Sequence, residues 1–267
     1  MSLADKLTMV IHSCNKFSDL WDTHVQLLEE NWPDRNIPTY ILTDCESEKK
    51  YPNVSILSAG EGKELSQRTA FALEQIKTEF VLITLDDYFL IKPVASETIT
   101  GVLDMMDAEN FDYVRLYLRP KCKEKNRIKK YGKVYHIDTN DRYCVNLYVG
   151  IWRKSFLEKT IGETKNAWQY EVSLPRIARE VGARCAMSNN DEFVILDVVR
   201  KGKLLHKANR YLKKRNLYHG DRPVISYWDE IKLGIRTWGI RIMPKWVTRL
   251  VRSFMIKLGH HYYSQDE

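Results

Sequence analysis

Apolar residues recur along the first ninety positions in short runs that alternate with segments of helical periodicity. The runs have the length and the β-branched content of strands, whereas the segments between them carry apolar residues on one side only. The order of strands and helices favours an α/β fold with a mainly parallel sheet flanked by helices. The predicted strands cover residues 6–14, 39–44, 53–60 and 80–85, and the predicted helices cover residues 17–32 and 64–77.

The pattern is less regular after residue 93. A domain boundary is most easily accommodated between Gly220 and Pro223, which divides the chain into a domain at 1–220 and a basic, helical appendage at 221–267. Within the domain we expect a helix at 96–109, a strand at 112–118, a polar stretch with little periodicity at 119–143, a strand and short helix in 145–161, a helix at 166–182 interrupted near Pro175, and a strand at 192–204.

The run FVLITL at 80–85 is apolar without a break, as in a strand that is covered on both faces, and Asp86 and Asp87 follow it directly. Adjacent carboxylates resist desolvation unless a cation or a hydrogen-bonding ligand joins them. Ligands of parallel sheets bind beyond the carboxyl ends of the strands, where Cys14, Asp44 and Ala59 would also gather. The pair therefore predicts a site for Mn²⁺ or Mg²⁺ that neutralises a diphosphate. The alternative is a solvated strand-to-loop turn.

The composition is that of a folded chain. Its 267 residues are 44% hydrophobic and 11% aromatic, enough for one sizeable core. The five cysteines are an odd number without close paired spacing, and the N-terminus lacks the pattern of a signal peptide. No apolar run approaches the roughly 20 residues of a membrane-spanning helix. We therefore expect a cytoplasmic protein in a reducing compartment.

The net charge of +7 conceals an asymmetry. Residues 200–259 hold 16 Lys or Arg against 3 Asp or Glu, a net charge of +13, whereas residues 1–199 carry −4. Residues 244–259 place Trp246 and other apolar residues on one helical face and Lys and Arg on the other. Such a helix suits an anionic membrane surface, or it packs on the core or on a second subunit of a homo-oligomer. The sequence leaves these alternatives open.

The order of these motifs resembles a known family, the nucleotide-sugar-dependent glycosyltransferases of GT-A fold, and within it the bacterial enzymes of surface-polysaccharide (capsule and lipopolysaccharide) biosynthesis. The resemblance covers residues 6 to about 207. LDDYFL at 85–90 resembles the DXD-type motif, and ILTD at 41–44 resembles the strand whose terminal Asp meets the nucleoside. LSQRTAFALEQIKTEFVLITLDD at 65–87 is similar to the helix and strand that lead to the metal. GIWRKSFL at 150–157 with NAWQYE at 166–171 resembles the acceptor-side segment.

The resemblance implies a Rossmann-like GT-A domain and a role for each matching residue. Asp87 would bind the metal, while Asp86 would contact the ribose, the metal or its water shell. Asp44 would bind the base or ribose, and Arg68 would reach the diphosphate or the sugar. The first Asp of a D-x-D triplet is absent because Leu85 fills that position, which leaves open which Asp binds the metal.

The resemblance also places His12 and Ser13 in the nucleotide pocket. Later in the chain, RKGKLLHK at 200–207 has the composition of a phosphate-binding segment, and we assign Lys203 to the nucleotide-sugar. The family likeness adds His206 as a further metal ligand. A solvated basic face is the alternative for this segment.

Glu171 is the predicted general base, from its place in the W-x-x-E of the acceptor-side segment. An inverting transfer removes a proton from the acceptor hydroxyl as that oxygen attacks the anomeric carbon, a role that suits a carboxylate beside apolar rings. Trp168 and Trp152 are the predicted acceptor-side residues. The alternative is a surface Glu beside a core Trp, with Trp168 as part of the core.

The predicted function is metal-dependent transfer of a sugar from a nucleotide-sugar, with a UDP-sugar as the first donor expected, to a saccharide or lipid-linked acceptor. We expect the protein in the cytoplasm or on the inner face of the cell membrane. A nucleotidyltransferase is one alternative, but HSCNKFSDL at 12–20 lacks the Gly-rich phosphate loop of such enzymes. A non-enzymatic membrane- or nucleic-acid-binding adaptor is another; no groove-reading or stacking module is apparent, so we expect no nucleic-acid partner.

Overall fold

The computed structural model describes residues 2–141, 143–162, 165–218, 220–232 and 234. The chain forms two compact units, Met1–Leu196 and Asp197–Glu267. Most of the predicted appendage at 221–267, including the helix expected at 244–259, lies outside the described residues. The predicted domain boundary therefore stays a prediction.

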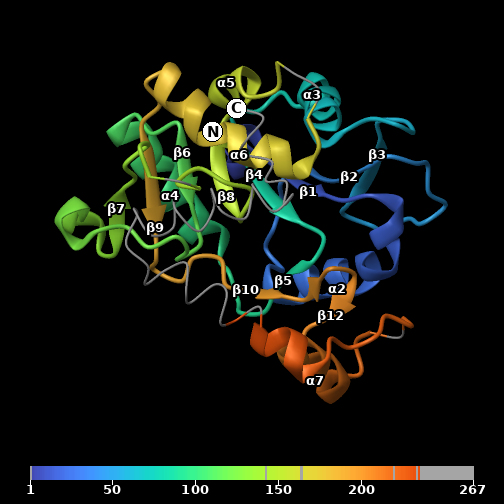
Figure 1. Cartoon of the computed structure of the whole chain (residues 1–267). Helices are drawn as coiled ribbons and strands as arrows, with labels where there is room; N and C mark the ends of the chain where they lie inside the picture. The colour runs from blue at the N-terminus through green and yellow to red at the C-terminus, as the bar shows by residue number, and fades with distance from the viewer. Residues whose placement is uncertain (1, 142, 163–164, 219, 233, 235–267) are drawn as a thin grey trace, which may run out of the picture. The chain divides into compact units, whose positions relative to one another are not determined.

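The first unit is built on an eight-stranded sheet (Figure 1). In the order in which they lie side by side, its strands are β3 (Ser55–Ser58), β2 (Thr39–Thr43), β1 (Leu7–His12), β4 (Phe80–Leu85), β8 (Gly150–Arg153), β6 (Tyr113–Arg115), β9 (Cys185–Ser188) and β7 (Val134–His136). The first four strands run parallel to one another. Strand β8 is antiparallel to both β4 and β6, β9 is parallel to β6, and β7 is antiparallel to β9.

Helices cover both faces of this sheet. One hydrophobic cluster joins the sheet to α2 (Trp21–Asn31) and α4 (Ser96–Glu109). A second cluster joins the opposite face to α3 (Leu65–Gln75), α5 (Lys154–Lys159) and α6 (Ala167–Glu180). The predicted α/β class, a mainly parallel sheet flanked by helices, is confirmed.

The apolar run of β4 follows from its position between the two clusters. Phe80 and Leu82 belong to the cluster under α2 and α4, whereas Val81 and Ile83 belong to the cluster under α3, α5 and α6. A strand covered in this way is apolar at successive positions, because neither face meets water. The polar residues that follow β4 therefore stand at the edge of the sheet.

The expected interruption of the helix at Pro175 is wrong. Helix α6 runs through Pro175 without a break, and this proline is buried inside it. Proline has no N–H to donate to the carbonyl group four residues earlier, which here is that of Glu171. The buried face of α6, with Leu174 and Ala178 fully inaccessible, stabilises the helix against that loss.

Two other segments are more divided than predicted. The polar stretch at 119–143 contains two short 3₁₀ helices, η2 (Glu124–Asn126) and η3 (Lys129–Tyr131), and also supplies strand β7 to the sheet. The single strand expected at 192–204 is three short strands, β10 (Ile195–Asp197), β11 (Val199–Arg200) and β12 (Lys203–Leu204). Strand β10 pairs with β5 (Tyr88–Leu90). The remaining elements of the first unit are α1 (Leu3–Lys6) and η1 (Asn15–Leu20).

The second unit contains a hairpin and a basic helix. Strands β11 and β12 are antiparallel, and Lys201 and Gly202 turn the chain between them with φ angles of 52° and 76°. Helix α7 (His206–Arg215) follows, and residues 227–232 form a further helical segment. None of the helices in the described part of the chain combines the length and the apolar character needed to cross a membrane.

Candidate active site

The ends of the parallel strands meet at one edge of the sheet, as the sequence predicts. The N–H of Asp86 donates to the carbonyl of His12 at 3.0 Å, and the N–H of Ser13 donates to the carbonyl of Leu42 at 2.9 Å. These bonds continue the ladders β1–β4 and β1–β2 past the last residues of the strands. The segments that follow β1, β2 and β4 are therefore neighbours, which brings Asp44 to the same edge.

Asp86 is held in a buried hydrogen-bond network. Its side chain is 7% exposed and accepts a hydrogen bond from the Ser13 hydroxyl. The same hydroxyl oxygen accepts a hydrogen bond from the Trp21 indole N–H at 2.6 Å. On the backbone side, His24 Nδ1 lies 3.1 Å from the carbonyl oxygen of Asp86, so that nitrogen carries the proton. The network fixes the turn through Ser13, the residue that follows β1, and through Trp21 and His24 of α2.

Asp87 occupies the second position of the turn between β4 and β5 and is partly exposed. The turn is joined to a buried strand on both sides, because β5 is itself inaccessible to solvent. The burial of Asp86 does not fit the solvated strand-to-loop turn that was the alternative for this pair, and the role of the pair stays a prediction. Asp86 is buried, and Asp87 is partly exposed, although its Oδ1 is inaccessible to solvent.

Asp44 and Arg68 stand beside this turn. Oδ1 of Asp44 accepts a hydrogen bond from the Asn15 N–H at 2.7 Å, and Arg68 on α3 donates from Nη1 to the carbonyl of Ser13. Partial burial acts to raise the pKa of Asp44, but hydrogen bonds from Asn15 and Thr43 and the charge of Arg68 hold it below its usual value. Asp44 is therefore an anion at neutral pH, with a guanidinium group at the same edge.

His12 is a core residue and does not line an open surface. It is 3% exposed, and it lies among Val10, Thr69 and Leu73 on the side of the sheet that α3 covers. Burial, and secondarily the charge of Arg68, lowers the pKa of His12 to about 3, so its ring is neutral. The expectation that this ring lines the nucleotide pocket is corrected: only the backbone of His12 reaches the edge, where its carbonyl accepts from Asp86.

Strand β8 brings a second group of residues to this edge. Gly150, its first residue, pairs with Ile83 of β4, so the segment that precedes β8 lies near the end of β4. In that segment the ring of Tyr148 stacks on Tyr88, with centroids 5.7 Å apart, and packs on Tyr117 at 4.6 Å. The three tyrosine rings form a continuous row, the tyrosine row, that begins at the residue after Asp87.

Glu171 belongs to the same neighbourhood. Its carboxylate accepts a hydrogen bond from the N–H of Leu147 at 3.4 Å, and Leu147 immediately precedes Tyr148. The side chain of Asn166 caps the start of α6, accepting from the N–H groups of Trp168 and Gln169 at 3.0 Å each, and so fixes the first turn of the helix that carries Glu171. The structure therefore brings Glu171 and the Asp86–Asp87 turn to one edge of the sheet.

The two predicted acceptor-side tryptophans differ in their surroundings. Trp168 is 61% exposed at the start of α6, so it is not the core residue that was the alternative for it. Trp152 is fully buried and packs on Tyr113 and Phe156. The prediction that Trp152 contacts an acceptor is wrong, because its place in the middle of the sheet lies between two layers of side chains.

Lys203 and His206 belong to the second unit. The ring of His206 stacks on Tyr227 at a centroid distance of 3.8 Å, and its Nε2 lies 3.7 Å from a carboxylate oxygen of Glu230. Lys203 is exposed in the β11–β12 hairpin. Their parts in binding a diphosphate or a metal stay predictions.

The donor atoms at the edge fit a metal that is shared with a substrate. Among the described residues, no group of three or more His, Cys, Asp or Glu side chains converges on one point. Mg²⁺ bound with a phosphorylated substrate commonly uses one or two carboxylates and completes its shell with phosphate oxygens and water. Asp87, with Asp86 beside it, supplies that partial set of hard oxygen donors.

Comparison with known proteins identifies similar folds at low sequence identity. No protein-family model matches the chain, and no curated protein sequence matches it. Among solved structures, it is similar to a fragment of S. aureus TarS in complex with UDP-GlcNAc, with a TM-score of 0.51, 16% identity, and coverage of 74% of this chain and 60% of that chain. It is also similar to the mannosyltransferase PcManGT from Pyrobaculum calidifontis in complex with GDP-Man and Mn²⁺, with a TM-score of 0.51, 14% identity, and coverage of 82% and 66%.

The match spans 36% of the longer TarS chain and 60% of the fragment, so it accounts for only part of those proteins. At these identities the likeness concerns the fold. The first unit thus has an α/β architecture similar to that of GT-A glycosyltransferases.

The buried histidines predict a loss of stability in acid. Burial lowers the pKa of His24 to about 4 and that of His12 to about 3, whereas the unfolded chain binds these protons near the ordinary value of 6.5. As the pH falls below about 6.5, only the unfolded state gains protons, so the free energy of unfolding decreases until the folded values are reached. We expect a loss of several kcal/mol in urea titrations between neutral pH and about pH 4.

The substitution His12→Phe removes one of these titrating groups and should make the pH dependence shallower. His136→Phe is the control, because His136 is exposed at the end of β7. Equal slopes for the wild type and His12→Phe would contradict the assignment of His12 as a buried neutral group.

Proposed function

We propose that this protein is a glycosyltransferase that moves a sugar from a nucleotide-sugar to a hydroxyl group of an acceptor. The observation that carries the proposal is the shared sheet edge, to which separate parts of the sequence bring the Asp86–Asp87 turn, Asp44, Arg68 and Glu171. The similarity of the fold to that of glycosyltransferases also supports a function in sugar transfer. A UDP-sugar is the first donor to test.

The nucleotide side of the site uses Asp44, Arg68 and Asp87. Asp44 accepts hydrogen bonds from the ribose or base, as an ionised carboxylate can. Arg68 neutralises part of the charge on the diphosphate. Asp87 would hold Mn²⁺ or Mg²⁺, and Asp86, fixed by Ser13, sets the direction of the turn. The bound cation would supply Lewis-acid stabilisation of the departing diphosphate.

Glu171 acts on the acceptor. It accepts the proton of the acceptor hydroxyl while that oxygen forms a bond to the anomeric carbon of the donor. The bond from the anomeric carbon to the diphosphate oxygen breaks, and the nucleoside diphosphate leaves with the electron pair. Attack from the face opposite the leaving group inverts the anomeric configuration. Trp168, exposed three residues before Glu171, offers an apolar face to the acceptor.

The acceptor is a saccharide or a lipid-linked glycan of surface-polysaccharide biosynthesis, met at the inner face of the cell membrane. The second unit supports this part of the proposal through its charge and its exposed aromatic residues. Tyr227 and Trp228 are 68% and 74% exposed, and α7 carries three basic residues in its last turn. Aromatic and cationic side chains together suit an anionic lipid surface.

Removal of the Asp87 carboxylate should abolish metal-dependent nucleotide binding. We expect UDP with Mn²⁺ to raise the melting temperature of the wild type in a thermal-shift assay, and we expect Asp87→Ala to eliminate that rise because the cation loses its protein ligand. Asp104→Ala is the control, since Asp104 is an exposed acid on α4. The absence of a shift with every nucleotide and metal tried would count against the proposal.

Neutralisation of Glu171 should affect transfer but not nucleotide binding. With the donor sugar identified by the thermal shift, Glu171→Gln should lower kcat by about a hundredfold to ten-thousandfold, as is usual for loss of a general base. The thermal shift with UDP and Mn²⁺ should stay as in the wild type. The matched control is Glu180→Gln, at an exposed position of the same helix. Full activity of Glu171→Gln would exclude this residue as the base. Release of pyrophosphate by the wild type, in place of a nucleoside diphosphate, would indicate a nucleotidyltransferase.

A further inference from the structure

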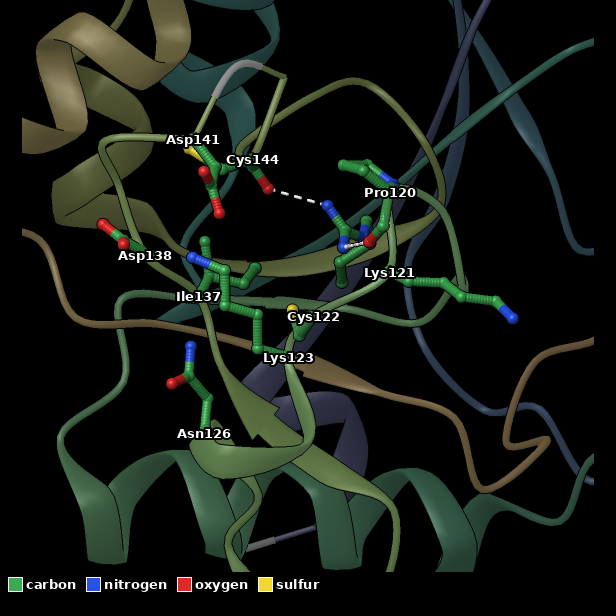
Figure 2. Close-up of a pocket in the computed structure, with 10 residues that line it drawn as sticks. Pro120, Lys121, Cys122, Lys123, Asn126, Ile137, Asp138, Asp141 and Cys144 are labelled. Atoms are coloured by element: carbon green, nitrogen blue, oxygen red, sulfur yellow. Dashed lines mark hydrogen bonds between the residues drawn. The ribbon is translucent and has the colours of Figure 1, made fainter. Parts of the chain in front are cut away.

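A cavity of about 230 Å³ opens at the carboxyl end of β6 (Figure 2). Besides Arg115, the residues that line it are Pro120, Lys121, Cys122, Lys123, Asn126, Ile137, Asp138, Asp141 and Cys144. None of the residues assigned above to the nucleotide, the metal or the general base lines it. The cavity is smaller than the ~300–1,000 Å³ typical of pockets for drug-sized ligands, and it leaves room for a group the size of one sugar ring.

Arg115, the last residue of β6, forms the inner wall of the cavity. It is fully buried and donates to the carbonyl oxygens of Tyr117 at 3.0 Å, Cys144 at 2.7 Å, and Pro120. These three bonds tie together the two segments that enclose the cavity. Because carbonyl oxygens already surround its guanidinium group, the charge of Arg115 does not by itself require an anionic ligand.

The other side of the cavity carries carboxylates, which accept hydrogen bonds, together with ammonium and amide groups, which donate them. Asp138, Asp141, Asn126 and Lys123 line it, whereas the side chain of Lys121 extends away from them (Figure 2). An anion would meet the two carboxylates at close range, and an apolar ligand would remove them from water without replacing their hydrogen bonds. A neutral polyhydroxyl group avoids the repulsion and replaces the hydrogen bonds of water, since each hydroxyl can donate to a carboxylate and accept from an ammonium or amide group.

The cavity lies close to the proposed site of transfer. Arg115 pairs with Gly150, and Gly150 pairs with Ile83, so β6 is two strands from β4 and about 10 Å away at the usual strand spacing. Both strands run in the same direction, and their carboxyl ends therefore point to the same edge. The tyrosine row of Tyr88, Tyr148 and Tyr117 spans the interval, and the backbone of Tyr117 is itself bonded to Arg115.

We propose that this cavity binds one neutral sugar unit of the acceptor. The inference rests on the proposed glycosyl transfer and extends it: the acceptor is an oligosaccharide, one unit of which is held beside Asp141 and Lys123 while another receives the transferred sugar. These residues then determine which acceptors are used. They take no part in the chemistry at the anomeric carbon.

The test is direct binding of neutral disaccharides in the absence of nucleotide. Saturation-transfer NMR with lactose, maltose, cellobiose and N,N′-diacetylchitobiose should find at least one that binds the wild type. Asp141→Ala and Lys123→Ala should each raise its Kd about tenfold or more, the usual effect of losing a hydrogen bond to a charged group. The matched control is Lys125→Ala, since Lys125 belongs to η2, the 3₁₀ turn that begins directly after Lys123, but does not line the cavity. It should leave the Kd unchanged.

A third cavity variant distinguishes loss of binding from loss of folding. Cys122→Met enlarges a half-buried side chain that lines the cavity and should exclude the disaccharide while the melting temperature and the UDP-dependent thermal shift are retained. Binding that is unchanged in all three cavity variants would overturn the assignment, as would no binding of any disaccharide at tens of millimolar. Inorganic phosphate binding that strengthens in Asp141→Ala would identify an anion site and equally overturn it.

The same measurements separate this inference from the proposed function. Disaccharide binding that responds to Asp141→Ala, in a protein that binds no nucleotide, would retain the saccharide site while the proposal of glycosyl transfer fails. Intact nucleotide binding without disaccharide binding would overturn the cavity assignment alone.

Discussion

The hydrogen bond between the Ser13 hydroxyl and the Asp86 carboxylate is the contact on which the proposed site depends. It joins the ends of β1 and β4, and it is supported by the Trp21 indole on one side and by His24 at the Asp86 carbonyl on the other. A buried carboxylate is costly unless it is hydrogen-bonded, so this network explains how the first acid of the pair is tolerated at 7% exposure. The two acids of the pair therefore differ in burial: Asp86 is held inside the turn, whereas Asp87 is partly exposed.

The part of this arrangement that comes from local pattern could be predicted. The unbroken apolar run at 80–85 indicates a strand covered on both faces, and parallel strands necessarily present their carboxyl ends at one edge, so the proximity of Asp44 and the Asp86–Asp87 pair follows from strand order alone. Pro175 shows the limit of such reasoning. Its local preference against a helix interior is real, but the burial of the α6 face outweighs it.

What could not be predicted depends on contacts between distant segments. Arg115 bonds to the carbonyl of Cys144, 29 positions later, and Tyr88 stacks on Tyr148; no local periodicity marks either pair. The resemblance of GIWRKSFL to an acceptor-side segment places Trp152 near the acceptor, but exposed and core tryptophans look alike in a sequence, and its position in a central antiparallel strand buries it. Of the tyrosine row, only Tyr88 could be linked to the site from the sequence, because it follows the acidic pair directly. The proposed site thus combines a sheet edge that follows from topology with neighbouring residues that are brought there by long-range packing.

The central claim is that the Asp86–Asp87 turn presents a carboxylate to a cation shared with a diphosphate. Anomalous diffraction from crystals grown with Mn²⁺ and UDP tests it most directly, because the manganese position is located without reference to any assumed role. We expect the strongest anomalous peak at coordination distance, about 2.0–2.6 Å, from an Asp87 oxygen and in contact with the diphosphate. A manganese peak elsewhere, or UDP bound at a site remote from this turn, would contradict it.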